Sequence, residues 1–125
     1  MIEGTVNENY EASIHLTLRG TTGEEHDIEA IIDTGFTGHL TLPMTLIDRL
    51  ALSWQSRGQA LLADGSLHVF DAYMGIVLWN GQDRTVEVDA ADTDPLVGMG
   101  LLRGHGLRVD VVENGAVKIE ELIYR

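Results

Sequence analysis

Residues 30–38 read Ala-Ile-Ile-Asp-Thr-Gly-Phe-Thr-Gly, an apolar run that ends in an acid, a hydroxyl residue and a glycine. An ionised carboxylate resists transfer out of water, so an acid at the end of a buried strand needs something to compensate for its desolvation. Catalysis is one common reason for such a placement, because active sites tune the charge state of acids by burial. The sequence contains the Asp-Thr-Gly triplet once, at residues 33–35.

The length and composition of the chain limit what it can be. A chain of 125 residues predicts a single domain, residues 1–125, that is large enough to bury a core without disulfides or metals. The sequence has no cysteine, which excludes thiol chemistry. No apolar run approaches the ~20 residues that a membrane-spanning helix needs, so we expect a cytoplasmic protein that does not enter a membrane.

The charge of the chain restricts its partners. Eight basic residues stand against twenty acidic ones, which gives a formal net charge of -12. This balance argues against a nucleic-acid partner, because the phosphate backbone requires a basic protein surface. A cationic or neutral partner would suit the charge, although solubility is the simpler explanation for it.

Hydrophobic alternation indicates that Asp33 follows a strand. Apolar and polar residues alternate over 11–19 and again over 25–32, which predicts two half-buried strands joined by a turn at 20–23. The second strand delivers Asp33 at its C-terminal end. The elements expected next are a tight loop at 34–38, an extended run at 39–42 and a helix from Pro43 to about residue 52.

The rest of the chain predicts short strands and turns. Its fourteen glycines are consistent with many turns between strands. We expect strands at 58–63, 66–79, 85–88, 95–98, 107–112 and 116–121, turns at 64–65, 80–81 and 114–115, an acidic loop at 89–94 and a helical turn at 99–103. The architecture is therefore mainly β, a small barrel or sandwich with one substantial helix.

The residue types at 33–37 suit the hydrolysis of an amide. In such chemistry one carboxylate activates water and a second acid protonates the carbonyl oxygen. Two aspartates about 3 Å apart cannot both ionise, so they share one proton and divide these roles. Gly35 lets the backbone approach the carboxylates and offers an N–H donor. Thr34 can bond across to a partner loop, and Thr37 can donate to the outer oxygen of Asp33.

The stretch 31–38 resembles the active-site loop of the aspartic proteases. A single copy in so short a chain is similar to the retropepsin-like group, in which two chains each supply one aspartate. The second signature of that family is a pair of apolar residues and a glycine before a short helix, and Leu96, Val97 and Gly98 match it. The continuation at 36–43 resembles bacterial and archaeal members of this clan AA type more than viral ones.

This resemblance implies a fold and an activity. The fold is a closed or partly open β-barrel of the retropepsin-like, acid-protease type, with one or two short helices. The activity is that of an aspartic endopeptidase, a homodimer without a cofactor that hydrolyses a peptide or protein substrate between two Asp33 carboxylates. The implied catalytic residues are Asp33, Thr34 and Gly35, the supporting residues are Thr37, Leu96, Val97 and Gly98, and the flap over the substrate is Ala63, Asp64, Gly65 and Ser66.

Two features depart from the viral pattern. The flap lacks the glycine-rich tip of the viral enzymes, and the chain ends do not match their interlocking terminal strands. Residues 116–124 are the best candidate for a subunit contact. The same fold could instead serve as a non-proteolytic dimeric module that binds peptides or acts as a scaffold.

Other residues have simpler interpretations. The hairpin at 64–65 could be a surface turn. We expect no metal site, because the five histidines are scattered and residues 89–94 lack the glycine and distal glutamate of a calcium loop. Trp54 and Trp79 are expected to pack within the protein rather than to contact a substrate.

Overall fold

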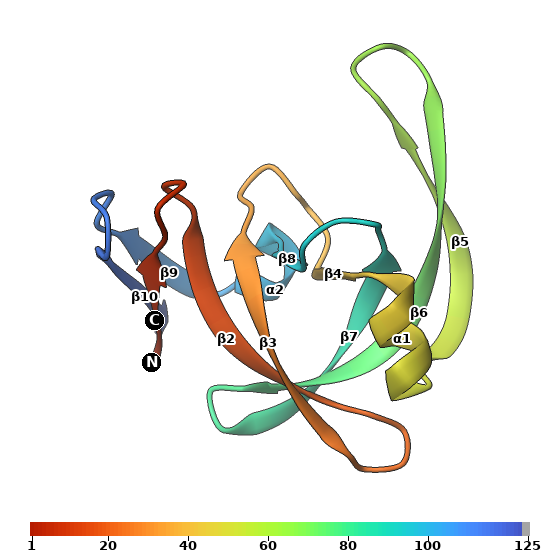
Figure 1. The fold of residues 1–125 in the computed structure, drawn as a ribbon, viewed down its shortest axis with the longest axis horizontal. Helices are drawn as coiled ribbons and strands as arrows, with labels where there is room; N and C mark the ends of the chain where they lie inside the picture. Colours follow the sequence, from red (N-terminus) through yellow and green to blue (C-terminus); the bar gives the residue numbers. More distant parts are fainter. Residues whose placement is uncertain (124–125) are drawn as a thin grey trace.

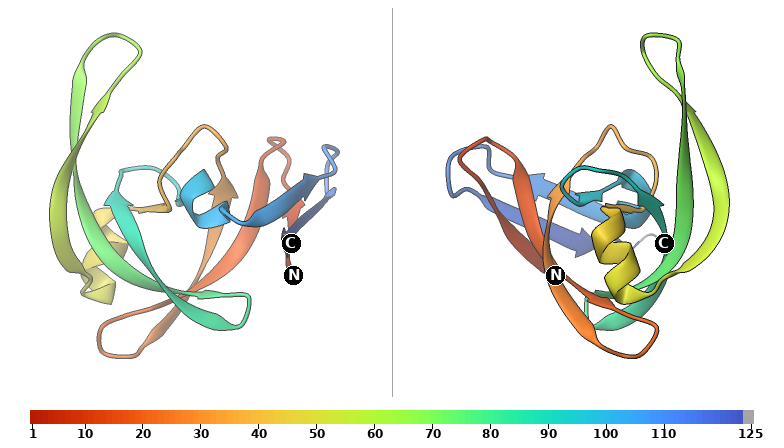
Figure 2. Two further views of the ribbon diagram at one scale, coloured as in Figure 1. Left: turned by 180° about the vertical axis from the view of Figure 1, so that it is seen from behind. Right: turned by 45° about the vertical axis from the view of Figure 1, so that its right-hand side comes forward.

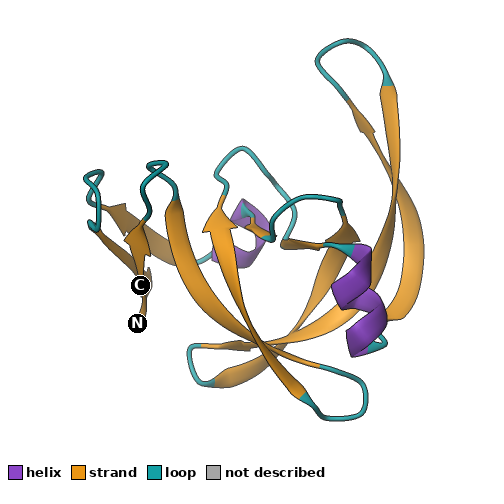
Figure 3. Ribbon diagram, viewed as in Figure 1, coloured by secondary structure: helices purple, strands orange, loops and turns teal. Residues whose placement is uncertain are grey.

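The computed structural model describes residues 1–123, which form ten strands and two short helices (Figures 1 and 3). The strands are β1 (Ile2–Val6), β2 (Ala12–Arg19), β3 (Glu25–Ile32), β4 (Leu40–Leu42), β5 (Ser53–Leu61), β6 (Leu67–Trp79), β7 (Gln82–Ala90), β8 (Leu96–Val97), β9 (His105–Val109) and β10 (Ala116–Glu121). The helices are α1 (Met44–Leu50) and α2 (Met99–Leu102). The protein is mainly β, which confirms the fold class predicted from the sequence.

All ten strands belong to one sheet, in the order β5-β6-β7-β4-β8-β3-β2-β1-β10-β9. An additional pairing between β2 and β6, with Thr17 opposite Leu78, closes six strands into a ring where the sequence predicts a barrel. Alternate side chains of these strands point to the inside, because successive residues of a strand face opposite ways. The buried core includes Ile14, Leu16, Leu18, Leu40, Leu42, Val77, Val88 and Val97.

Two parts of the sheet extend beyond the ring (Figures 1 and 2). On one side, β5 and β6 form a long hairpin whose tip rises away from the rest of the molecule. On the other side, β10 pairs with both β1 and β9, so that β5 and β9 are the two edges of the sheet. The hairpin tip, the loop after β3 and the turns after β1 and β9 all lie at one end of the molecule (Figure 1).

Several predicted boundaries are confirmed and others are wrong. The strands predicted at 25–32 and 116–121 are β3 and β10, whereas β1 was not expected. The helix α1 ends before residue 52 because Ala51 takes a left-handed conformation with φ of 52° and caps it. Within residues 1–123, no helix is both long enough and apolar enough to cross a membrane.

The prediction that residue 89 belongs to a loop is wrong, because Asp89 lies in β7. It is held there by two neighbours, with Thr41 opposite it in β4 and Ala72 opposite it in β6. The expected burial of Trp79 is confirmed, but Trp54 is 55% exposed. The Trp54 indole N–H donates instead to Asp71 Oδ1 at 3.1 Å.

Candidate active site

Asp33 stands at the end of β3, where two distant parts of the chain meet. β8 lies between β3 and β4, parallel to β3 with Ile32 opposite Val97, and antiparallel to β4. The Asp33 N–H donates to the Val97 carbonyl oxygen at 2.9 Å. The Asp-Thr-Gly motif at 33–35 and the Leu-Val-Gly motif at 96–98 therefore form one continuous structure around Asp33.

Leu96 and Val97 contribute to this structure in different ways. Val97 is fully buried in the core, whereas Leu96 is half-buried beside Asp33. The Leu96 N–H donates to the Thr41 hydroxyl oxygen at 3.0 Å, which gives the buried Thr41 side chain a partner. Strand β8 is thus fixed on both sides although it has only two residues.

The loop after Asp33 is fixed by three consecutive N–H groups at the start of α2. These bonds run from Gly98 to the His39 carbonyl (3.0 Å), from Met99 to the Phe36 carbonyl (2.8 Å) and from Gly100 to the Gly38 carbonyl (2.9 Å). Because backbone groups make all three contacts, the shape of the loop depends on the position of β8 and α2 rather than on side-chain rotamers. Such a loop is preorganised before any ligand binds.

Two glycines leave room for the Phe36 ring under this loop. A Cβ on Gly98 would lie 2.5 Å from Phe36 Cδ2 and 2.8 Å from the Phe36 carbonyl oxygen, and a Cβ on Gly38 would lie 2.5 Å from Phe36 Cζ. The φ of Gly98 is -99°, so close approach and not backbone conformation requires a glycine there. The packing of Phe36 was missed in the sequence, where the only signal is the glycine two residues later.

The Asp33 carboxylate is half-buried and accepts a hydrogen bond at Oδ1 from the Gly35 N–H, at 2.9 Å. Thr34 and Gly35 beside it are exposed. Thr37 is exposed as well, and within this chain the donor to Asp33 is the Gly35 N–H rather than the Thr37 hydroxyl that the sequence suggested.

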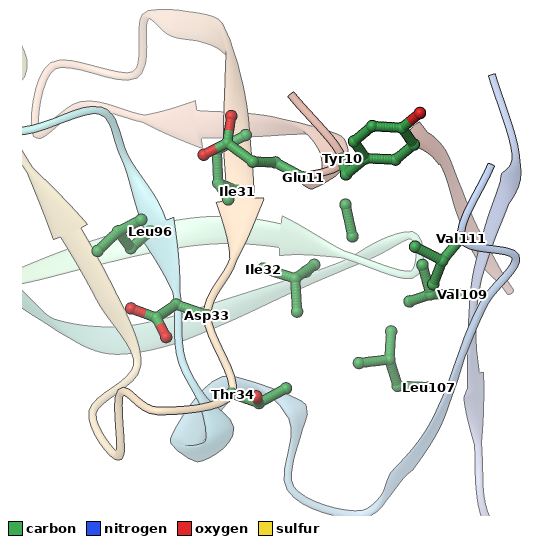
Figure 4. Close-up of a pocket in the computed structure, with 11 residues that line it drawn as sticks. Tyr10, Glu11, Ile31, Ile32, Asp33, Thr34, Leu96, Leu107, Val109 and Val111 are labelled. Atoms are coloured by element: carbon green, nitrogen blue, oxygen red, sulfur yellow. The ribbon is translucent and has the colours of Figure 1, made fainter. Parts of the chain in front are cut away.

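An apolar pocket of about 480 Å³ lies beside Asp33 (Figure 4). Asp33 and Thr34 form part of its wall, together with Ile32 of β3 and Leu107 of β9. Its lining also includes residues of the exposed turns after β1 and β9, among them Tyr10. Because the wall comes from segments far apart in the sequence, no local pattern could have predicted it.

The predicted flap residues Ala63, Asp64, Gly65 and Ser66 form the exposed tip of the β5–β6 hairpin. Asp64 Oδ1 accepts hydrogen bonds from the Ser66 hydroxyl (2.6 Å) and the Ser66 N–H (2.9 Å). The Ser66 hydroxyl, which has the larger effect, and the Ser66 N–H both lower the pKa of Asp64 below its usual value. The flap tip is therefore a defined turn, and in this chain it lies well apart from the loop that follows β3 (Figure 1).

A second carboxylate, Asp89, lies against the Asp33 loop. Its Oδ2 is 3.3 Å from the position that a Cβ on Gly38 would take. Burial, followed by the neighbouring Glu87 carboxylate, raises the pKa of Asp89 to about 6. The sequence offers one signal for this position, the alternation Val86-Glu87-Val88-Asp89, which continues the strand pattern into the acidic segment.

Metal ligands do not gather in the described part of the chain, where no three His, Cys, Asp or Glu side chains lie close enough to hold an ion.

No protein-family model matches the sequence, and no curated protein matches it. Among solved structures, the chain is similar to the crystal structure of a retropepsin-like aspartic protease from Rickettsia conorii, with a TM-score of 0.61 and 16% identity. The match covers 96% of this chain and 89% of that one. The chain therefore has a retropepsin-like fold, which confirms the fold expected from the resemblance.

Proposed function

We propose that this protein is an aspartic endopeptidase that acts as a homodimer. The observation that carries the proposal is the position of Asp33, at a strand end and bonded to Val97 through its N–H, in a loop that the start of α2 fixes. The similarity to a retropepsin-like aspartic protease supports a hydrolase of this class. The finer claims, catalysis and dimerisation, rest on the chemistry of Asp33.

In the proposed dimer, Asp33 and Asp33 of the partner subunit share one proton and hold a water molecule between them. The ionised carboxylate takes a proton from the water while the water oxygen attacks the carbonyl carbon of the peptide. The protonated carboxylate gives its proton to the carbonyl oxygen. The C–N bond then breaks as the nitrogen takes up the proton that came from water, while one hydroxyl of the tetrahedral diol returns its proton to the other carboxylate. This leaves a carboxylic acid and an amine, and it restores the proton that the two aspartates share. The Gly35 N–H holds Oδ1 of each aspartate in place.

One Asp33 in each chain requires an active site on a two-fold axis. Such an axis passes close to Asp33 and Thr34, so a second copy would cover the apolar pocket that these residues border. Tyr10 and Val111 line the same pocket and are 65% and 66% exposed in the single chain. Their removal from water would favour association.

This pocket suits the subunit contact better than the segment suggested by the sequence, residues 116–124. Its described strand, β10, is already paired on both edges, by β1 and by β9. Tyr124, the last residue of that segment, lies outside the described residues. We therefore propose the edge strand β9, which contributes Leu107 to the pocket, as part of the contact between subunits.

The proposed substrate is a peptide in an extended conformation that lies between Asp33 and the flap. An extended chain pairs through its backbone groups and offers alternate side chains to pockets on either side. The flap tip, Ala63 to Ser66, would close over it from above. No cofactor takes part in this chemistry.

The test compares the wild-type chain with Asp33→Asn. Both are incubated at pH 4–6 with a pool of random octapeptides, the products are identified by mass spectrometry, and the oligomeric state is measured by sedimentation. We expect a dimer in both cases and cleavage by the wild type alone. Asp27→Asn is the matched control, because Asp27 is an exposed aspartate of the same strand, and it should cleave as the wild type does. Equal cleavage by Asp33→Asn would sink the assignment.

A second candidate function is a dimeric peptide-binding module that does not cleave. The observation that favours it is the flap tip, which has no glycine-rich segment and is bonded internally through Asp64 and Ser66. Peptide retention by the wild type without cleavage at any pH, unchanged in Asp33→Asn, would support this candidate over the first.

A further inference from the structure

The position of Asp89 shows which face of the flap is turned toward the Asp33 loop. Asp89 Oδ2 approaches Gly38 of that loop. Ala72 of β6 is opposite Asp89 in the antiparallel register, so the two side chains lie on the same face of the sheet. Ala72 is only 1% exposed. The face of β6 that carries Ala72 is therefore the face on the side of the Asp33 loop.

Aromatic side chains continue this face toward the flap tip. Strand residues two apart share a face, so Phe70 and His68 follow Ala72 on the same side. Their rings are stacked, with centroids 6.4 Å apart and an interplanar angle of 21°. The Phe70 ring lies over Gly58 of β5, where a Cβ would be 2.6 Å from Phe70 Cε2. The face of β6 that is turned toward the Asp33 loop is thus aromatic near the flap tip, at Phe70 and His68.

Phe70 and Asp89 are diagonal neighbours across the β6–β7 pairing. Such neighbours have Cβ atoms roughly 7 Å apart, a separation that aromatic and long side chains can span. The Phe70 ring itself is turned toward Gly58 of β5. Asp89 forms no ion pair with any residue of the described chain. The carboxylate of Glu87 lies on the same face and raises the pKa of Asp89 further, and no cation within residues 1–123 forms an ion pair with Asp89.

The opposite face of the flap arm is different. Asp71 lies there, between Phe70 and Ala72 in the sequence, and it already has partners. It accepts the Trp54 indole N–H at 3.1 Å and the Arg57 Nε–H at 3.4 Å. The flap strand β6 thus carries Asp71, which has a cationic partner in Arg57, and it lies beside Asp89, which has no cationic partner among the described residues.

We propose that Asp89 and Phe70 form a subsite for a basic side chain, arginine or lysine, of the substrate. The proposal rests on the proposed endopeptidase function and names a substrate class for it. A guanidinium or ammonium group that reached Asp89 would gain a charge-assisted hydrogen bond to the carboxylate. The face of the Phe70 ring would attract the same cation. A chain of net charge -12 would also draw basic peptides toward it from solution.

The experiment uses pairs of octapeptides that differ only by arginine or glutamine at one position, with that position moved along the peptide. Cleavage is measured at about pH 6.5, where Asp89, with its pKa of about 6, is mainly ionised. We expect the wild type to prefer arginine at one position by roughly tenfold in kcat/KM, since a lost charge-assisted hydrogen bond costs at least that factor. Asp89→Asn should bring this ratio close to one. Phe70→Leu should lower it by roughly threefold, because a cation–π contact is weaker.

Asp71→Asn is the matched control, because it removes an acid from the other face of the same arm, and it should keep the full preference. Thermal unfolding of each variant checks that it folds. If Asp89→Asn keeps the wild-type ratio, or if no position prefers arginine, the subsite is wrong while the protease remains. If the wild type cleaves nothing, the proposed function fails, and the subsite is tested by binding instead.

In that case the affinity of the Asp33→Asn chain is measured for the same peptide pairs. A roughly tenfold higher affinity for the arginine peptide, lost when Asp89→Asn is added to Asp33→Asn, supports the subsite. Equal affinities for the two peptides overturn the subsite.

Discussion

The Asp33 loop and the flap lie at the same end of the molecule, but they are held in opposite ways. Three backbone N–H groups of 98–100 fix the Asp33 loop, and the fully buried Leu40 and Val97 lie beneath it. In the outer flap, residues 61–69 are all exposed. Leu61 and Leu67, opposite each other near its tip, are 72% and 65% exposed.

This difference matches two separate needs of a hydrolase. A reacting carboxylate is most effective when its surroundings are fixed before substrate arrives. A cover over the substrate must open to admit it, and segments with few buried contacts open at the lowest free-energy cost. The contrast between the two regions therefore supports the proposed function independently of the Asp-Thr-Gly triplet, and it can be tested directly.

The largest expected effect concerns cleavage. Replacing the reacting group by Asp33→Asn should lower kcat/KM by about 10³-fold or more, because the general base is lost. Asp64→Ala, which removes only the internal bonds of the flap tip, should stay within about tenfold of the wild type. Peptide hydrolysis rates measure both. Comparable losses from the two substitutions would contradict the assigned roles.

The next effect concerns stability. Gly98→Ala places a Cβ against the Phe36 and Gly38 carbonyl oxygens and should lower the free energy of unfolding by about 3 kcal/mol. Gly65→Ala meets no atom within 4 Å and has only its positive φ of 85° to overcome, which costs about 1 kcal/mol. Urea unfolding gives both values. A larger loss of unfolding free energy for Gly65→Ala than for Gly98→Ala would contradict this contrast.

Hydrogen exchange should separate the two regions without any mutation. The amides of Asp33 and Met99, which bond across the fixed loop, should exchange at least about 100-fold more slowly than those of Gln59 and Val69 in the flap ladder. Exchange measured by NMR at one pH and temperature is sufficient. Uniform protection of the four amides would mean that the flap is as firmly held as the loop.

The smallest effect depends on pH and involves Asp89. Its pKa rises from 3.8 to about 6 on folding, so the folded chain binds this proton more tightly than the unfolded chain. The stabilisation is complete below pH 4 and is lost as pH rises through about 6. Asp89→Asn should therefore stabilise the protein at pH 8 by about 1 kcal/mol, after allowance for solvent screening, and hardly at all at pH 4. Urea unfolding at the two pH values checks this, and an equal gain at both would refute it.

The sequence predicts those parts of the fold that depend on local patterns. Strand β3 alternates regularly, and its end at Asp33 follows from that pattern together with the glycine at 35. Strand β1 was missed because its five residues include a glycine and an acid, and it is held by pairing with β10, as in Ile2 opposite Ile119. Contacts between chain ends leave no local signal.

In the candidate site, too, some residues could be predicted from the local sequence and others depend on contacts between distant parts of the chain. Asp33 and Gly98 stand out because the chemistry and the close packing at these positions permit few other residues. Asp89 looked like part of a solvated loop, since acids are rare in strands. Its pairing with Thr41 and Ala72 overrides that preference. The pocket beside Asp33 has walls from four parts of the chain, and only the folded structure brings them together.

A single Asp33 in each chain has a consequence for mixtures of wild-type and inactive subunits. In the proposed dimer an active centre needs two intact chains, so the active fraction follows the square of the intact fraction. An equal mixture with Asp33→Asn chains would leave roughly a quarter of the pairs active if subunits exchange freely. An allele that encodes asparagine at residue 33 would thus be dominant, because it would lower the activity of the wild-type chains that pair with its product.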